Sequence, residues 1–215
     1  MVTNIDRKHR LARIWSNEQL ARIAPVFTGH VVNVSAWDDR DKQDRHYKDY
    51  FVNAGSYSYT NYKGYRGFQG TENEYLMDLT EDMPAELVHK FDVAYNHTTL
   101  EHIFDVRKAF ANICKLSRDA VIIVVPFAQV QHEAEDYEDY WRFTPSCLRR
   151  LFEENGLGVI FESISPYRDS AVYLLFVGSR NPGYWAGVLP FYKRLSNIGE
   201  WIGEALPQNA HGIVE

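Results

Sequence analysis

A nearly continuous apolar run, DAVIIVVPF at residues 119–127, constrains the fold of this chain more than any other feature. Such a run is typical of a strand whose two faces are both covered, as in a parallel sheet between two layers of helices. It is interrupted by Pro126, and it is far shorter than the about 20 residues that a membrane-spanning helix needs. The run therefore predicts a buried central strand and no membrane segment.

Strand and helix patterns alternate on both sides of this run. Further strands are predicted at 30–37, 56–62, 74–79, 91–97, 159–165 and 171–179, and helices at 6–26, 38–51, 99–117 and 144–155. Alternation of this kind indicates an α/β domain with a mostly parallel sheet. The last two strands have only a short connection between them, so we expect them to form an antiparallel pair that completes a seven-stranded sheet.

Composition narrows the class of protein. The chain has 215 residues, of which 45% are hydrophobic and 24% charged, values that are ordinary for a folded domain. Its formal net charge is −6, whereas general nucleic-acid-binding proteins are usually basic, so nucleic acid is not expected as a partner. Cys114 and Cys147 form no metal or redox motif and are expected to be small core residues of a cytoplasmic protein. The charged N-terminus has no apolar signal core, and no membrane association is expected.

The predicted domain organisation has three parts. Residues 1–29 form an N-terminal helical segment, residues 30–180 form the α/β domain, and residues 181–215 form a C-terminal extension. This extension is rich in aromatic residues, which rarely stay in water. We therefore expect it to pack on the domain or on a second copy of the chain, which would make a homo-oligomer. Its aromatic residues are Tyr184, Trp185, Phe191, Tyr192 and Trp201.

Several separate segments resemble the class I S-adenosylmethionine-dependent methyltransferases. In chain order they are FDVAYNHTTLEHIFDVRKAFANICKLSRDAVIIVVPF (91–127), then His132, then DYWRFTPSCLRRLFEENGL (139–157). In that family an FD(V/L)…LEH(I/V) junction is followed by a buried strand, a loop with a histidine and DYWR(F/Y)T, and a helix. The resemblance implies a Rossmann-like methyltransferase fold. It also implies transfer of a methyl group from S-adenosylmethionine to a small molecule or sugar.

The cofactor region departs from the family's pattern. The family's first strand leads into a glycine-rich turn, whereas here the stretch reads NVSAWDD, with Ser35, Trp37 and Asp39 where glycines are expected and Asn33 in place of an acid. The second strand ends at Asn61, whose amide lacks the charge of the acid that usually holds the ribose. The residues that the resemblance places against the cofactor are Ser35, Ala36, Trp37, Asn61, Asp78, Asn96 and His97.

The departures lead to a prediction about binding. A lost charged hydrogen bond weakens affinity roughly ten- to a hundredfold. We therefore expect weak or absent adenosylmethionine binding, and we expect the double substitution Asn61→Asp with Trp37→Gly to strengthen it.

Two histidines are candidate general bases, because the pKa of an unperturbed imidazole lies near neutrality. His102 is expected in the substrate cleft, and the alternative is a structural role at the start of a helix. His132 is expected on a lid over the substrate, and the alternative is an incidental histidine in a solvated loop. The HTTLEH spacing matches no zinc motif, so no metal site is expected.

Three further residues are candidates for substrate binding. Glu101 lies beside His102, and Tyr140 and Arg142 lie on the proposed lid, where they offer an aromatic platform and an anion-binding fork. Trp141 and Phe143 are better explained by core packing.

Two functions remain open at this point. The first is a methyltransferase, which needs mainly to align donor and acceptor. The second is a catalytically inactive binding or scaffold protein that kept the fold and lost the cofactor. The retained NHTTLEH and DYWRFT segments favour the enzyme, whereas NVSAWDD and Asn61 favour the scaffold.

Overall fold

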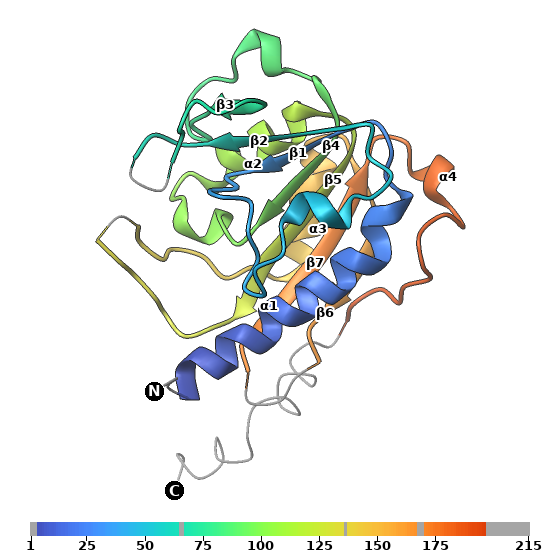
Figure 1. Ribbon diagram of the computed structural model, residues 1–215. Helices are drawn as coiled ribbons and strands as arrows, with labels where there is room; N and C mark the ends of the chain where they lie inside the picture. The colour runs from blue at the N-terminus through green and yellow to red at the C-terminus, as the bar shows by residue number, and fades with distance from the viewer. Residues whose placement is uncertain (1–3, 65–66, 136, 167–169, 197–215) are drawn as a thin grey trace, which may run out of the picture.

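Seven strands form one sheet in the order β3-β2-β1-β4-β5-β7-β6. They appear in a computed structural model that describes residues 4–64, 67–135, 137–166 and 170–196 (Figure 1). β7 runs antiparallel to both β5 and β6, while the pairs from β3 to β5 are parallel. The predicted fold class is thus confirmed. The strands are β1 His30–Val34, β2 Ser56–Asn61, β3 Glu74–Leu76, β4 Phe91–His97, β5 Ser117–Ala128, β6 Gly158–Ile164 and β7 Val172–Ser179.

Helices cover both faces of the sheet (Figure 1). α1, Asn4–Ile23, crosses one face, and α2, Val106–Leu116, and α3, Pro145–Glu154, cover the other. A short helix α4, Pro182–Trp185, follows β7. Four single-turn 3₁₀ helices lie in the connections: η1 Ala24–Val26, η2 Tyr47–Tyr50, η3 Ala85–Leu87 and η4 Leu100–His102.

β5 explains the apolar run of the sequence, because its alternate side chains enter two different cores. Val121, Ile123 and Val125 belong to the core under α2 and α3. Ala120, Ile122 and Val124 belong to the core under α1. Successive side chains of a strand point to opposite faces, so a strand covered on both faces is apolar throughout.

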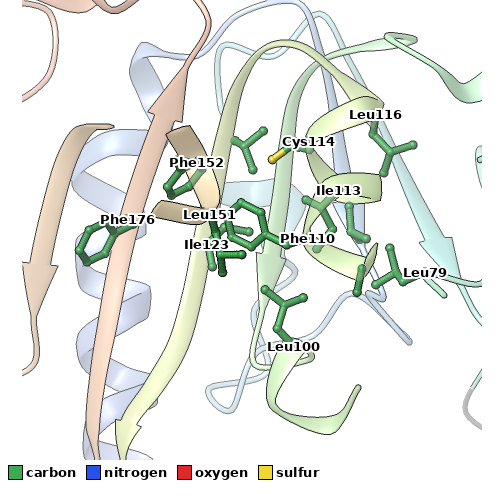
Figure 2. Packing of buried hydrophobic residues seen from close by; sticks show 14 of the residues in the cluster. Leu79, Leu100, Phe110, Ile113, Cys114, Leu116, Ile123, Leu151, Phe152 and Phe176 are labelled. Carbon is green, nitrogen blue, oxygen red and sulfur yellow. The ribbon is translucent and has the colours of Figure 1, made fainter. Parts of the chain in front are cut away.

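Aromatic rings fill the core under α2 and α3 (Figure 2). The rings of Phe110 and Phe152 meet edge to face with centroids 5.0 Å apart, and Phe176 of β7 lies in the same core. Phe152 also rests on Gly178, where an added Cβ would lie 2.4 Å from the ring. The close approach of α3 to β7 therefore requires a glycine at this position.

The start of α3 follows the prediction. Thr144 caps the helix by accepting a hydrogen bond from the Cys147 amide, and Pro145 occupies the first turn. Gly156 follows the helix at a φ of +73°, a left-handed conformation that glycine adopts without strain.

The predicted helix at 38–51 is wrong. This segment is a loop of turns with only the single turn η2. The carboxylate of Asp41 accepts hydrogen bonds from the backbone amides of Gln43 and Arg45, and that of Asp39 from Lys48. These short side chains bind the amides that a helix would use.

The predicted helix at 99–117 begins later than expected. α2 starts at Val106 with Asp105 as its cap, and the preceding residues form η4. The two cysteines also differ from expectation: Cys114 is buried, but Cys147 is exposed on α3.

The C-terminal extension is described as far as residue 196. Trp185 and Leu189 are buried, whereas Tyr184 and Phe191 are exposed. Tyr192 packs against the core under α1, and Trp201 lies outside the described residues. The three-part division of the chain and the pairing with a second copy stay predictions.

Candidate active site

A cleft of about 530 Å³ opens at the carboxyl ends of β1 and β2. This is the edge at which open α/β sheets bind their ligands. Its walls come from the turn after β1, the segments after β2 and β3, η4, and the segment before α3. The lining residues are Ser35, Trp37, Asn61, Tyr62, Lys63, Gly64, Gly67, Met77, Asp78, Leu79, Thr80, Thr99, His102, Ile103, Phe104, Tyr137 and Tyr140.

The turn after β1 has the backbone of a glycine-rich turn without the glycines. Ser35, Trp37 and Asp39 have φ values of +58°, +52° and +58°, so all three lie in the left-handed region. They are the three positions at which the resemblance expects glycine. Each left-handed residue other than glycine costs about 1–2 kcal/mol, and such strain persists only where surrounding contacts impose it.

Asn61 imposes the conformation at the centre of the turn. Its Oδ1 accepts a hydrogen bond from the Trp37 amide at 2.7 Å, and its Nδ2 donates to the Trp37 carbonyl at 3.0 Å. Nδ2 also donates to Glu74 Oε1 at 2.7 Å. The Asn61 side chain therefore lines the cleft, but its amide group forms these hydrogen bonds within the protein. The exposed indole of Trp37 lies at the cleft wall.

Asp39 holds the far end of the turn. Its buried carboxylate accepts hydrogen bonds from Asn33 Nδ2 and the Tyr57 hydroxyl. Burial raises the pKa of Asp39, although these hydrogen bonds act in the opposite direction. Asn33 thus stabilises the turn through Asp39 and does not line the cleft.

Asp78 brings a carboxylate to the cleft just after β3. Its Oδ1 accepts hydrogen bonds from the Thr80 amide and hydroxyl at 2.8 and 2.7 Å. Among the described residues no hydrogen bond reaches Oδ2 in the cleft, so this oxygen is free to accept one from a ligand.

Asn96 and His97 lie outside the cleft. Asn96 is fully buried and donates to the Val34 carbonyl, where it ties β4 to the end of β1. The His97 Nε2 lies 2.8 Å from Ser16 Oγ on α1. Burial lowers the pKa of His97, so its imidazole is neutral at pH 7.

His102 lines the cleft. Its Nδ1 lies 2.7 Å from the Glu138 carbonyl oxygen, which requires a proton on Nδ1 and leaves the lone pair on Nε2. Burial lowers the pKa of His102, partly offset by this hydrogen bond. The imidazole is therefore a neutral base at pH 7.

His132 lies behind His102 and does not line the cleft. The two rings meet edge to face with centroids 4.9 Å apart, and the ring of Tyr137 contacts both. His132 Nδ1 lies 3.4 Å from Asp139, whose carboxylate also accepts the His132 amide. The structure thus brings both predicted bases into one aromatic cluster but exposes only His102 to the cleft.

The three predicted substrate residues have different positions. Tyr140 lines the cleft and its hydroxyl donates to Glu138. Arg142 forms two 2.6 Å hydrogen bonds to Asp139 and others to backbone carbonyls, so it braces the segment before α3. Burial raises the pKa of Asp139, but these hydrogen bonds from Arg142 prevail and hold it at about 2. The Glu101 side chain is fully buried.

Trp141 and Phe143 differ from each other. Phe143 is a core residue, as predicted. Trp141 is exposed, and its indole nitrogen donates to the Ile103 carbonyl.

Sequence reasoning missed several cleft residues, among them Tyr62, Lys63, Phe104 and Tyr137. Phe104 is the clearest case, because 72% of its surface is exposed. It directly follows LEHI, and the helical pattern of the sequence places it within the predicted helix at 99–117. A large apolar side chain beside polar residues at a strand end was the available signal.

The fold matches solved methyltransferases. A chain of the Haloferax volcanii complex between the Trm112 methyltransferase activator and a methyltransferase is 16% identical, with a TM-score of 0.56 over 82% of this chain and 92% of that one. The 1,6-didemethyltoxoflavin-N1-methyltransferase of Burkholderia thailandensis, crystallised with S-adenosylhomocysteine, is 17% identical, with a TM-score of 0.52 over 77% and 80%.

A third structure extends the comparison. Magnesium protoporphyrin IX methyltransferase of Synechocystis PCC 6803, with bound S-adenosylmethionine, is 10% identical, with a TM-score of 0.55 over 84% and 85%. The chain therefore has the class I methyltransferase fold. No family model and no curated protein matches the sequence.

None of the helices in the described ranges is long and apolar enough to cross a membrane. Within the same ranges, no group of three or more His, Cys, Asp or Glu side chains could hold a metal ion.

Proposed function

We propose that this protein is an S-adenosylmethionine-dependent methyltransferase that acts on a small molecule or sugar. The observation that carries the proposal is the strained turn after β1. Two of its three left-handed residues, Ser35 and Trp37, line a cleft at the carboxyl ends of the strands. A protein that used the sheet only as a scaffold would gain nothing from this strain.

The residues of the cleft fit the cofactor. Asp78 Oδ2 offers an acceptor for the adenine amino group. The exposed indole of Trp37 offers a flat surface for the adenine ring, and the turn of Ser35 and Ala36 lies at the end of β1, where the amino-acid part would bind. When bound, adenosylmethionine supplies an electrophilic methyl group.

The residues of the cleft orient the acceptor, accept its proton and exclude water. The cleft walls orient the acceptor, since alignment of the two reactants provides most of the rate enhancement in such a transfer. His102 lines the cleft with an unprotonated Nε2 and accepts a proton if the acceptor is a hydroxyl. Tyr140 and Phe104 form the outer wall and exclude water from the acceptor.

Isothermal titration calorimetry with S-adenosylmethionine and S-adenosylhomocysteine tests the proposal. The position of Trp37 at the cleft wall leads us to expect both to bind, in place of the weak binding expected from the sequence alone. We expect Trp37→Ala to weaken binding roughly 5- to 150-fold, because stacking on an indole contributes about 1–3 kcal/mol. Phe191→Ala is the matched control, because Phe191 is 96% exposed and lies outside the cleft. Absence of binding by the folded wild-type protein would refute the proposal.

The second candidate is an inactive binding or scaffold protein. The observation that favours it is the engagement of Asn61 with Trp37 and Glu74, which leaves no charged acceptor at the end of β2 for a ribose. Binding of another small molecule in the cleft, without binding of either cofactor form, would support this candidate.

A further inference from the structure

Glu101 is a buried carboxylic acid that the proposed function does not use. Its side chain is fully buried, and neither carboxyl oxygen has a hydrogen-bond partner within the described residues. Buried side-chain oxygens normally have partners, so an unpartnered pair needs an explanation. The side chain is placed by η4 and by the Glu101 carbonyl, which accepts the Tyr140 and Trp141 amides.

The nearest base to Glu101 is His102. Glu101 Oε1 lies 3.8 Å from His102 Nε2, the nitrogen that carries the lone pair. His102 faces the cleft, and Glu101 lies behind it in the protein. Glu101 therefore lies close to the His102 nitrogen that is able to accept a proton.

Charged and phenolic groups surround Glu101 from every packed element. Arg13 of α1 and Arg142 of the segment before α3 favour its charged form, and Asp139 of the same segment opposes it. The buried Tyr173 of β7 lies near Arg13 and Glu101. Burial raises the pKa of Glu101 to about 7, and the nearby Arg13 acts in the opposite direction.

We propose that Glu101 is a positioning residue that acts with His102 as a proton-accepting dyad, so that the cleft takes an acceptor carrying a hydroxyl group. This inference rests on the proposed function. The oxygen–hydrogen bond of the acceptor breaks, and its proton goes to His102 Nε2. The oxygen's electron pair bonds the methyl carbon of the sulfonium donor, and the pair of the broken carbon–sulfur bond stays on sulfur. Glu101 stabilises the resulting imidazolium.

The dyad can be tested without an acceptor. NMR titration follows the His102 ring proton and the Glu101 carboxyl carbon of the full chain from pH 4 to pH 9. In the wild-type protein the titrations of the two groups should be coupled, because the two groups share their protons. In Glu101→Gln the titration midpoint of His102 should fall by about one pH unit.

Two variants keep the test falsifiable. Glu138→Gln removes an exposed carboxylate near His102 but keeps the Glu138 carbonyl, and it should leave the titration unchanged. His102→Gln should move the Glu101 carboxyl titration to higher pH, which tests the pair if Glu101→Gln fails to fold. An unchanged His102 midpoint in Glu101→Gln, or an unchanged Glu101 midpoint in His102→Gln, would overturn the dyad.

Cofactor binding is measured on the same samples by calorimetry and separates the two ideas. Binding by wild type and Glu101→Gln alike is expected, because Glu101 lies outside the cleft lining. Coupled titration without cofactor binding would overturn the methyltransferase role, and with it the hydroxyl acceptor. Cofactor binding without coupled titration would overturn the dyad alone.

Discussion

The side-chain amide of Asn61 makes two hydrogen bonds to the backbone of Trp37, one to its amide at 2.7 Å and one to its carbonyl at 3.0 Å. Asn61, at the end of β2, thereby fixes the left-handed conformation of Trp37 in the turn after β1. These hydrogen bonds hold Trp37 in a conformation that a glycine would adopt without strain. It is also the reason why a change at Asn61 acts on the shape of the cleft.

Asn61→Asp should destabilise the protein. The new carboxylate would lose the donor to the Trp37 carbonyl and would face the Glu74 carboxylate, which now accepts from Asn61 at 2.7 Å. We expect a loss of about 1–3 kcal/mol in the free energy of unfolding, measured by urea denaturation at pH 7. Asn181→Asp, at an exposed position without a side-chain cap, is the control. Equal stability of both variants would refute the bracing role of Asn61.

Ser35 tests the strain of the turn. At a φ of +58°, Ser35→Gly should be more stable than Ser35→Ala by about 1 kcal/mol, since only glycine is free of the left-handed penalty. The same pair of substitutions at Ser146, an exposed residue of α3, should give the opposite order, because glycine disfavours helices. Thermal unfolding of the four variants measures both differences. If Ser35→Ala were as stable as Ser35→Gly or more stable, the turn would not be strained at Ser35.

Gly178→Ala should unfold the protein far more easily than Gly183→Ala. An added Cβ at Gly178 would lie 2.4 Å from Phe152, whereas nothing lies within 4 Å of one at Gly183. Overpacking of this kind typically costs about 1–3 kcal/mol. Urea denaturation of the two variants compares the costs, and Phe152→Leu should recover part of the loss in Gly178→Ala. Similar stability of the two alanine variants would contradict the close packing of α3 on β7.

Glu101 should make stability fall as pH rises through neutrality. Burial raises the pKa of Glu101 in the folded protein to about 7 from its ordinary value of 4.5, so the folded state holds a proton that the unfolded chain has already lost. Its contribution is fully present below about pH 4.5 and is lost as pH rises to about 7. Glu101→Gln should therefore gain stability relative to wild type between pH 5 and pH 8. A constant difference between the two proteins across this range would contradict the raised pKa.

Much of the fold followed from periodicity. The β5 run, the bounds of β4 at Phe91–His97 and the cap of α3 at Thr144 were predicted because each depends on local sequence. The segment 38–51 failed for a physical reason. Its aspartates bind backbone amides at short range, a competition that apolar periodicity does not report.

The site was predictable in position but not in detail. The strand ends placed Asp78 and His102 at the cleft, because the carboxyl edge of a parallel sheet gathers them. The role of Asn61 depends on its hydrogen bond to the Trp37 backbone, which is remote in sequence. The role of Arg142 depends on its hydrogen bond to Asp139, which the conformation of the loop determines. The burial of Glu101 behind His102 likewise arises only from the packing of α1 and the segment before α3 around η4.

We propose that the strained turn after β1 belongs to a cofactor site. Amide NMR of the isotope-labelled protein, titrated with S-adenosylhomocysteine, tests it most directly. We predict that the signals of Ser35, Ala36, Trp37 and Asp78 shift together with one dissociation constant. The amides of Gly158 and Val159, which line a second cleft of about 400 Å³ between α3 and β6, should stay in place. Saturable shifts at Gly158 and Val159 without shifts in the turn, or no shifts at all, would contradict the claim.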